Sequence, residues 1–330
     1  MATITNSLFV ILEIGICIIK FLPFKNDPKK IRKTLFALNQ DMFNRATESQ
    51  RRFIEETEAA CRNIFAIFMT FCLLSLFSWP IKVLFYEQRR FPIDVWLPFD
   101  PFENVSIYLG VFAYLFIATG NAPIGNAAID TLIAGLIIHA ACQFRILKDN
   151  LRCLSQRADE KLNGLPQELK EMKRNEIVYR NIRECILHYD AIYDFVKEVE
   201  KTFSVVIFSQ FAVSILVICI SCFQLSIAEP LTITFFAMVI YVVSLLLEIF
   251  LYCYYGTVLY EESNTLIAAI FDSEWYDLDE KSKKALFILM ERAKRPMMLT
   301  TGKLLSVSLE TWTMIIRRSY SLLAVLKNHQ

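Results

Sequence analysis

Six long apolar stretches alternate with strongly charged connections along the chain. Each stretch is long enough to form a helix across the hydrocarbon core of a bilayer, which takes about 20 residues. The pattern therefore predicts an all-α, polytopic helical membrane protein. The predicted spans are about 7–24, 64–85, 106–144, 202–225, 231–255 and 304–326.

The third stretch contains a predicted break at 120–126, where Gly, Asn and Pro are concentrated, so it reads either as two spans or as one broken span. The Lys/Arg distribution favours one crossing. The connection 24–62 holds nine Lys/Arg and 145–201 holds twelve, whereas 86–105 holds two and 226–230 none. One crossing places the basic connections together on the cytoplasmic side, as the positive-inside rule requires. Both termini are then predicted to lie outside.

The cytoplasmic connections 25–63, 145–201 and 256–299 are also predicted to be helical. Apolar residues at helical spacing predict an amphipathic helix over 168–203 that runs directly into the fourth span. A second helix is predicted over 281–295, ended by Pro296. Together these segments form a helical anchor domain suited to subunit assembly, within a single domain of residues 1–330.

The last stretch carries a polar stripe that lipid should exclude. At helical spacing its members fall in one narrow arc, and such a stripe needs another subunit or pore water beside it. The stripe consists of Lys303, Ser306, Glu310, Thr313, Arg317, Ser321, Ala324 and Asn328.

Composition argues against several function classes. Hydrophobic residues make up 55% of the chain and the net charge is +1, which gives no case for nucleic acid as a partner. The three histidines are far apart, and no catalytic or phosphate-binding motif is present. Cys219 and Cys222 have CxxC spacing but read as buried cysteines. We therefore predict no enzyme, no cofactor and no metal.

Charges are few within the predicted spans, and three of them are candidates for a role inside the membrane: Glu13, Lys20 and Glu248. Lys20 can extend its ammonium group to the interface. Glu13 is costly in lipid unless it is paired or hydrated, so it is either functional or satisfied by a hydrogen bond between helices.

Aromatic and thioether side chains gather in the outer halves of three spans. Their convergence would form a pocket for a small apolar ligand, and the alternative is simple aromatic packing between helices. The candidate ligand-binding residues are Phe77, Trp79, Tyr108, Phe112, Phe116, Phe235, Met238 and Tyr241.

Short motifs near the carboxy terminus resemble the signature of insect odorant receptors. They are RPMMLTTGK at 295–303, SLETW at 308–312 and RSYSLL at 318–323. Upstream runs resemble the same family, so the likeness covers nearly the whole chain. These runs are YG at 255–256, ES at 262–263, SEWYDL at 273–278, RFP at 90–92, WLPFD at 96–100 and SQFAVS at 209–214.

The resemblance implies a seven-span protein with a cytoplasmic amino terminus, of which this chain lacks the first span. It implies a ligand-gated, non-selective cation channel in the plasma membrane of sensory neuron dendrites, with an extracellular carboxy terminus. The expected partners are a common co-receptor in a heterotetramer, a small volatile hydrophobic ligand and the lipid bilayer. The resemblance places the pore gate at Val325, with Leu322, Leu326 and Asn328 beside it.

Three other functions remain open from the sequence. A gustatory-type receptor channel is a close relative of the preferred function. A metabotropic seven-helix receptor conflicts with the predicted orientation. A transporter would be favoured by a broken helix at 120–126 but would need inverted repeats, and none is visible.

Overall fold

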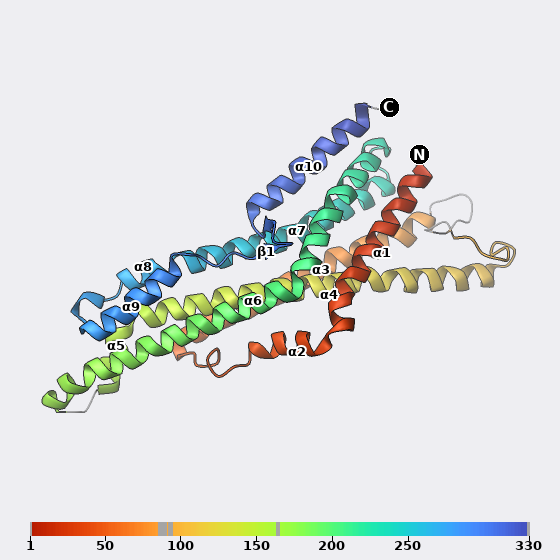
Figure 1. The fold of residues 1–330 in the computed structure, drawn as a ribbon. Coiled ribbons are helices and arrows are strands. Elements are labelled where there is room, and N and C mark those ends of the chain that lie inside the picture. The colour runs from red at the N-terminus through yellow and green to blue at the C-terminus, as the bar shows by residue number, and fades with distance from the viewer. Residues whose placement is uncertain (1, 85–90, 92–94, 163–165, 329–330) are drawn as a thin grey trace.

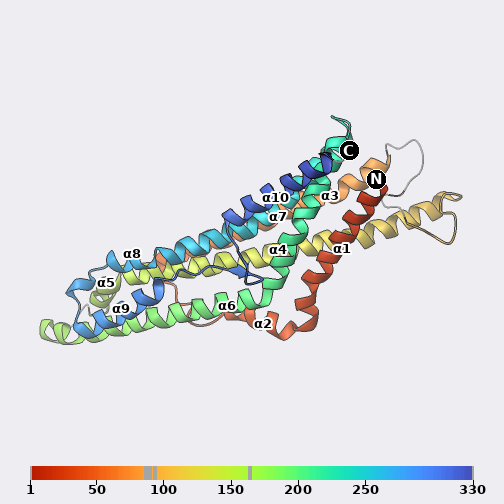
Figure 2. The same cartoon turned by 45° about the horizontal axis from the view of Figure 1, so that its top comes forward.

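The chain folds into an elongated helical bundle (Figure 1). The computed structural model describes residues 2–84, 91, 95–162 and 166–328, and the backbone alone at 2–10, 79–84, 167–168, 170–172, 234 and 326–328. In both views α5, α8 and α9 lie at one end, and α1 and α10 lie toward the other (Figures 1 and 2). The helices are α1 (Ala2–Asn26), α2 (Pro28–Ala37), α3 (Glu48–Leu84), α4 (Val105–Arg152), α5 (Leu154–Leu162), α6 (Gln167–Ile227), α7 (Ile233–Asn264), α8 (Leu266–Phe271), η1 (Trp275–Asp277), α9 (Glu280–Ala293) and α10 (Leu309–Asn328), with two short strands, β1 (Thr300–Thr301) and β2 (Leu305–Ser306).

Four helical segments of the described chain are long and apolar enough to cross a membrane, and they lie in α3, α4, α6 and α7–α8. Helix α6 has 61 residues. At 1.5 Å per residue it is about 90 Å long, far more than a hydrocarbon core of about 30 Å. Its charged first half therefore projects beyond the bilayer. The sequence predicted this continuous helix from the amphipathic pattern of 168–203.

Helix α4 is continuous through 120–126, so the predicted break is wrong. The glycines serve close packing instead. A Cβ on Gly125 would lie 2.6 Å from the Phe21 ring of α1, and one on Gly120 would lie 3.4 Å from Leu76 of α3. An unwound segment in lipid would leave backbone N–H and C=O groups without hydrogen-bond partners. The chain therefore stays helical around Pro123.

The last helix begins at Leu309, later than the sequence predicted. Residues 300–306 form a two-stranded hairpin in which Thr300 pairs with Ser306. Gly302 and Lys303 both have positive φ, at 58° and 59°, which turns the chain. Lys303 and Ser306 therefore lie outside the helical polar stripe, and the stripe begins at Glu310.

The hairpin docks on α6 because its backbone and hydroxyl donors find acceptors there. Thr301 donates to the Ser204 carbonyl at 2.7 Å, and the Gly302 N–H donates to the Ser204 hydroxyl at 3.0 Å. On the other side, Gly256 of α7 permits close approach, since a Cβ there would lie 2.1 Å from the Val307 carbonyl oxygen. The start of α10 is thus held between α6 and α7.

A buried ion cluster joins α1, α4 and α7. The Lys20 ammonium lies 2.8 Å from Asp130 and 2.5 Å from Glu248, and Lys20 is fully buried. The Tyr252 hydroxyl also donates to Asp130, to its Oδ1 atom at 2.5 Å. The expectation that Lys20 extends to the interface is wrong, because two carboxylates inside the bundle satisfy its charge better than a distant headgroup.

We predict that Lys20→Met prevents stable folding. Removing one partner of a buried ion pair costs about 3–5 kcal/mol, because Asp130 and Glu248 are then left buried without their cation. The triple variant Lys20→Met, Asp130→Asn, Glu248→Gln removes these charges together and should recover most of the folded protein. Size-exclusion chromatography of detergent-solubilised protein measures the monodisperse fraction. A wild-type yield of the single variant contradicts the role of the cluster.

Candidate functional site

A cavity of about 440 Å³ opens between α1, α3, α4 and α7. This volume lies in the range of small-molecule sites. Its walls are mostly apolar, and they include Ile14, Phe68, Leu76, Ala122 and Leu245. The four helices come together here because the glycines of α4 allow α1 and α3 to approach closely, and the ion cluster ties α1 to α4 and α7.

The ion cluster borders the cavity. Asp130 and Glu248 are among the lining residues, and along α4 the lining extends from Asp130 to Ala118. Twelve helical residues correspond to about 18 Å, so the cavity is deep and runs along the bundle. A ligand at its inner end would contact the same carboxylates that hold Lys20.

Hydrogen-bond acceptors predominate among the polar groups of the cavity. Glu13 lines it and accepts from the Tyr241 hydroxyl at 2.7 Å. The buried Oδ1 of Asn126 has no hydrogen-bond partner. The hydroxyls of Thr119 and Ser244 donate to backbone carbonyls of their own helices, which leaves their oxygens free to accept. A ligand that donates a hydrogen bond therefore suits this cavity better than one that only accepts.

Of the candidate ligand-binding residues that the sequence predicted, Tyr241 lines this cavity. Others form separate aromatic contacts. Phe77 and Phe116 have ring centroids 5.8 Å apart, and Tyr108 and Phe112 have centroids 6.1 Å apart. Phe77 is 52% exposed, so lipid or another subunit covers it.

Two further candidates lie on α7. Phe235 packs edge-on against Phe236, and Met238 is half-buried. The Trp79 side chain lies outside the described residues. The roles of these residues in ligand binding stay predictions.

Asp130 and Asn126 are site residues that the sequence reading missed. Asp130 stands in the middle of an apolar stretch, and an acidic residue in a span is by itself a signal of a polar partner or a site. Asn126 and Asp130 are one helical turn apart, so they share a face only if the helix is continuous. The predicted break at 120–126 therefore did not place them together. Glu13, which the sequence singled out, does line the cavity.

Helix α10 presents one face to the bundle and one face away from it. Ile315 and Ser319 are buried against the other helices, whereas Val325 is 51% exposed and Leu322 36% exposed. The side chains of Leu326 and Asn328 lie outside the described residues. The outward face carries Leu322 and Val325, two of the four residues predicted for the gate, and the role of all four stays a prediction.

Comparison with known proteins gives consistent matches over the chain. A family profile described as "7tm Odorant receptor" matches residues 1–320. Odorant receptor Or1 of Anopheles gambiae is 24% identical over 340 residues, which covers 98% of this chain and 81% of that protein. Odorant receptor 94a of Drosophila melanogaster is 26% identical over 269 residues, covering 80% of this chain and 65% of that protein.

The fold also matches a solved structure. The insect olfactory receptor OR5 from Machilis hrabei, in complex with eugenol, superposes with a TM-score of 0.83 and 17% sequence identity. The superposition covers 100% of this chain and 82% of that protein. This likeness shows that the polytopic helical fold is shared, and the family profile spans nearly all of the sequence. The chain therefore belongs to the insect odorant receptor family, a family of membrane receptors and not a class of enzymes.

Proposed function

We propose that this chain is an odorant-tuning subunit that binds a small volatile ligand in the cavity between α1, α3, α4 and α7. It gates a non-selective cation channel together with a common co-receptor. The observation that carries the proposal is a deep, mostly apolar cavity of about 440 Å³ inside an odorant receptor fold. The similar receptor OR5 is described in complex with eugenol, a small aromatic ligand, which supports a ligand of this size.

Helix α7 connects the cavity to α10. Ser244 and Glu248 face the cavity. On the same helix, the Leu246 carbonyl accepts from the Trp312 indole N–H at 3.4 Å, and the Phe250 ring packs edge-on against Trp312 at 5.6 Å. A ligand that favours one position of α7 therefore shifts the population of positions available to α10.

The orientation of the receptor follows from the Lys/Arg distribution. With the basic connections inside, the end with α5, α8 and α9 lies in the cytoplasm, and the carboxy terminus lies outside the plasma membrane of the sensory neuron. The transporter alternative loses its main argument, since α4 is not broken.

The test of the function is co-expression with and without the co-receptor while current is recorded during exposure to a panel of volatiles. We expect odorant-evoked current only with the co-receptor. Ser75→Phe places a ring in the cavity and should abolish this current. Leu74→Phe adds the same ring at the neighbouring position, which is 52% exposed, and should leave the current unchanged.

Two outcomes would contradict the proposal. One is the absence of evoked current in every combination after surface labelling has shown both subunits at the membrane. The other is a Ser75→Phe receptor with the wild-type dose–response curve, which would place the ligand elsewhere.

The acceptor-rich cavity predicts a second result. Glu13→Gln should weaken the response to ligands with a donor, such as alcohols and amines, about tenfold or more. The reason is that Gln replaces one carboxyl oxygen with an amide NH2 group, and a buried donor that faces another donor stays unpaired, which costs about 1–3 kcal/mol. The response to a hydrocarbon of the same skeleton should not change. Gln still accepts from Tyr241, so the fold is preserved. The matched control is Glu229→Gln in the exposed α6–α7 connection, and equal shifts for both ligand classes would refute selection by Glu13.

A third result concerns the gate. Val325→Asp places a carboxylate on the outward face of α10 and should increase cation conductance or alter ion selectivity, because charge rings in pores attract counter-ions. Val325→Ile keeps the apolar surface and serves as the control. Reversal potentials and single-channel currents measure the change. Unaltered values in the Asp variant would remove Val325 from the pore.

A further inference from the structure

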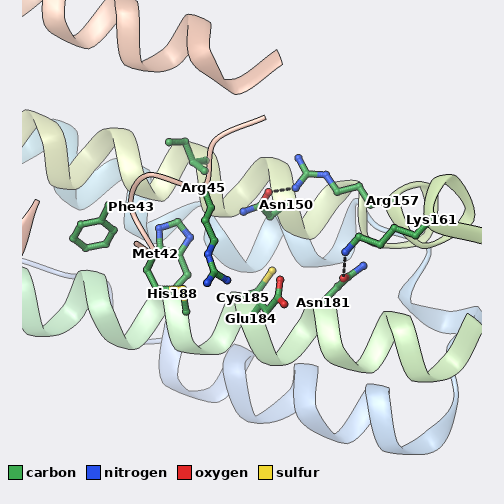
Figure 3. Close-up of a pocket in the computed structure, with 11 residues that line it drawn as sticks. Met42, Phe43, Arg45, Asn150, Arg157, Lys161, Asn181, Glu184, Cys185 and His188 are labelled. Atoms are coloured by element: carbon green, nitrogen blue, oxygen red, sulfur yellow. Dashed lines mark hydrogen bonds between the residues drawn. The ribbon is translucent and has the colours of Figure 1, made fainter. Parts of the chain in front are cut away.

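A second cavity is lined by residues that are all different from those of the ligand cavity (Figure 3). It includes residues of α5, which lies at the opposite end of the bundle from α1 and α10 (Figure 1). It has a volume of about 110 Å³, enough for a group with only a few heavy atoms. Its walls come from the α2–α3 connection, α4, α5 and α6. Four separate parts of the chain thus meet around one small space.

Three cations line this cavity. They are Arg45 of the α2–α3 connection and Arg157 and Lys161 of α5. Arg157 and Lys161 are four residues apart on one helix, where like charges repel by a few tenths of a kcal/mol. Glu184 is the carboxylate among the described lining residues. The positive charges therefore outnumber the negative charge at the cavity wall.

The partners of these cations are mostly neutral. Lys161 donates to the Asn181 amide oxygen at 3.0 Å, and Arg157 donates to the Asn150 amide oxygen (Figure 3). Arg157 also lies 2.9 Å from Asp149, which offsets one charge.

Within the described chain, the Arg45 side chain forms neither an ion pair nor a hydrogen bond. His188, which also lines the cavity, adds no charge. Burial lowers the pKa of His188 to about 4, so the ring stays neutral. An excess of positive charge therefore remains.

A buried donor in the same wall lacks an acceptor. Asn181 is 8% exposed, its Oδ1 accepts from Lys161, and its Nδ2 has no hydrogen-bond partner. Leaving a buried donor unpaired costs about 1–3 kcal/mol. An anion in the cavity would accept from Nδ2 and face all three cations. The unpaired donor and the excess of positive charge are independent observations, and they indicate the same kind of ligand.

The position of the cavity decides between a lipid headgroup and a free solute. Asn181 precedes the span predicted at 202–225 by about 21 residues of the continuous helix α6, or about 30 Å. This distance places the cavity beyond the reach of headgroups at the membrane surface. With the orientation proposed above, the cavity opens to the cytoplasm.

We propose that this cavity binds the phosphate group of a soluble phosphate ester. The phosphate oxygens would accept from Asn181 Nδ2 and pair with Arg45, Arg157 and Lys161, as arginine and lysine side chains do at phosphate sites. Binding would connect the α2–α3 connection to α5 and α6. That connection leads directly into α3, a wall of the ligand cavity, so a cytoplasmic metabolite would stabilise the receptor at a site distinct from the odorant site.

The test uses the full chain in phosphatidylcholine nanodiscs, with ATP and inorganic phosphate as probes in titration calorimetry and thermal unfolding. We expect saturable binding and a rise in the unfolding midpoint. Asn181→Asp keeps an oxygen for Lys161 but puts a carboxylate in the site, so it should abolish binding without loss of stability. Arg45→Gln should weaken binding about tenfold, which corresponds to about 1.4 kcal/mol. Arg52→Gln, an exposed cation paired with Glu56 on α3, is the matched control and should bind as the wild type does.

Three outcomes would overturn the proposal. The first is an absence of saturable binding at millimolar probe concentrations. The second is unchanged affinity in both Asn181→Asp and Arg45→Gln. The third is stabilisation by phosphoinositide in the nanodisc when neither soluble probe binds, which would make the ligand a lipid headgroup. Odorant-evoked current is not used as the readout, so the result is independent of the proposed channel function.

Discussion

A lysine ammonium buried within the bundle determines how three helices of this receptor meet. Lys20 contacts Asp130 and Glu248, and these residues come from α1, α4 and α7. A buried charge is stable only while its oppositely charged partners are in contact with it. Moving one of the three helices away from the others would therefore cost the free energy of an unpaired buried charge. The cavity lies against this cluster, and its shape depends on the same contacts.

The cluster also gives the cavity its polar character. Most of the wall is apolar, and its polar groups include carboxylates, hydroxyls and an unpaired amide oxygen. The hydrocarbon part of a ligand would therefore be buried against the apolar wall, and one hydrogen-bond donor of the ligand would fix its orientation. Because α7 bears both cavity residues and the contact with Trp312, a ligand held at this position acts on a helix that α10 already touches.

The bundle extends well past any bilayer, and its distal end is organised by other interactions. Glu262 of α7 pairs with Arg145 at 2.7 Å and with Lys148, both of α4. Apolar residues of α4, α6, α8 and α9 form part of the buried core. The basic cavity lies at the edge of this core, where the α2–α3 connection approaches α6. The two ends of the molecule are thus joined by continuous helices.

The sequence by itself determined the features that depend on local pattern. Apolar runs, helical spacing and short motifs were enough to predict the membrane spans of α3, α4, α6 and α7, the long helix α6 and the family. The tertiary structure alone decided the pairing of Lys20 with Asp130 and Glu248, which are 110 and 228 residues away in the chain. It also decided that Gly120 and Gly125 of α4 serve close packing and that a hairpin precedes α10. The physical reason is that periodicity reports which face of a helix is apolar, whereas a cavity and an ion pair depend on which faces meet.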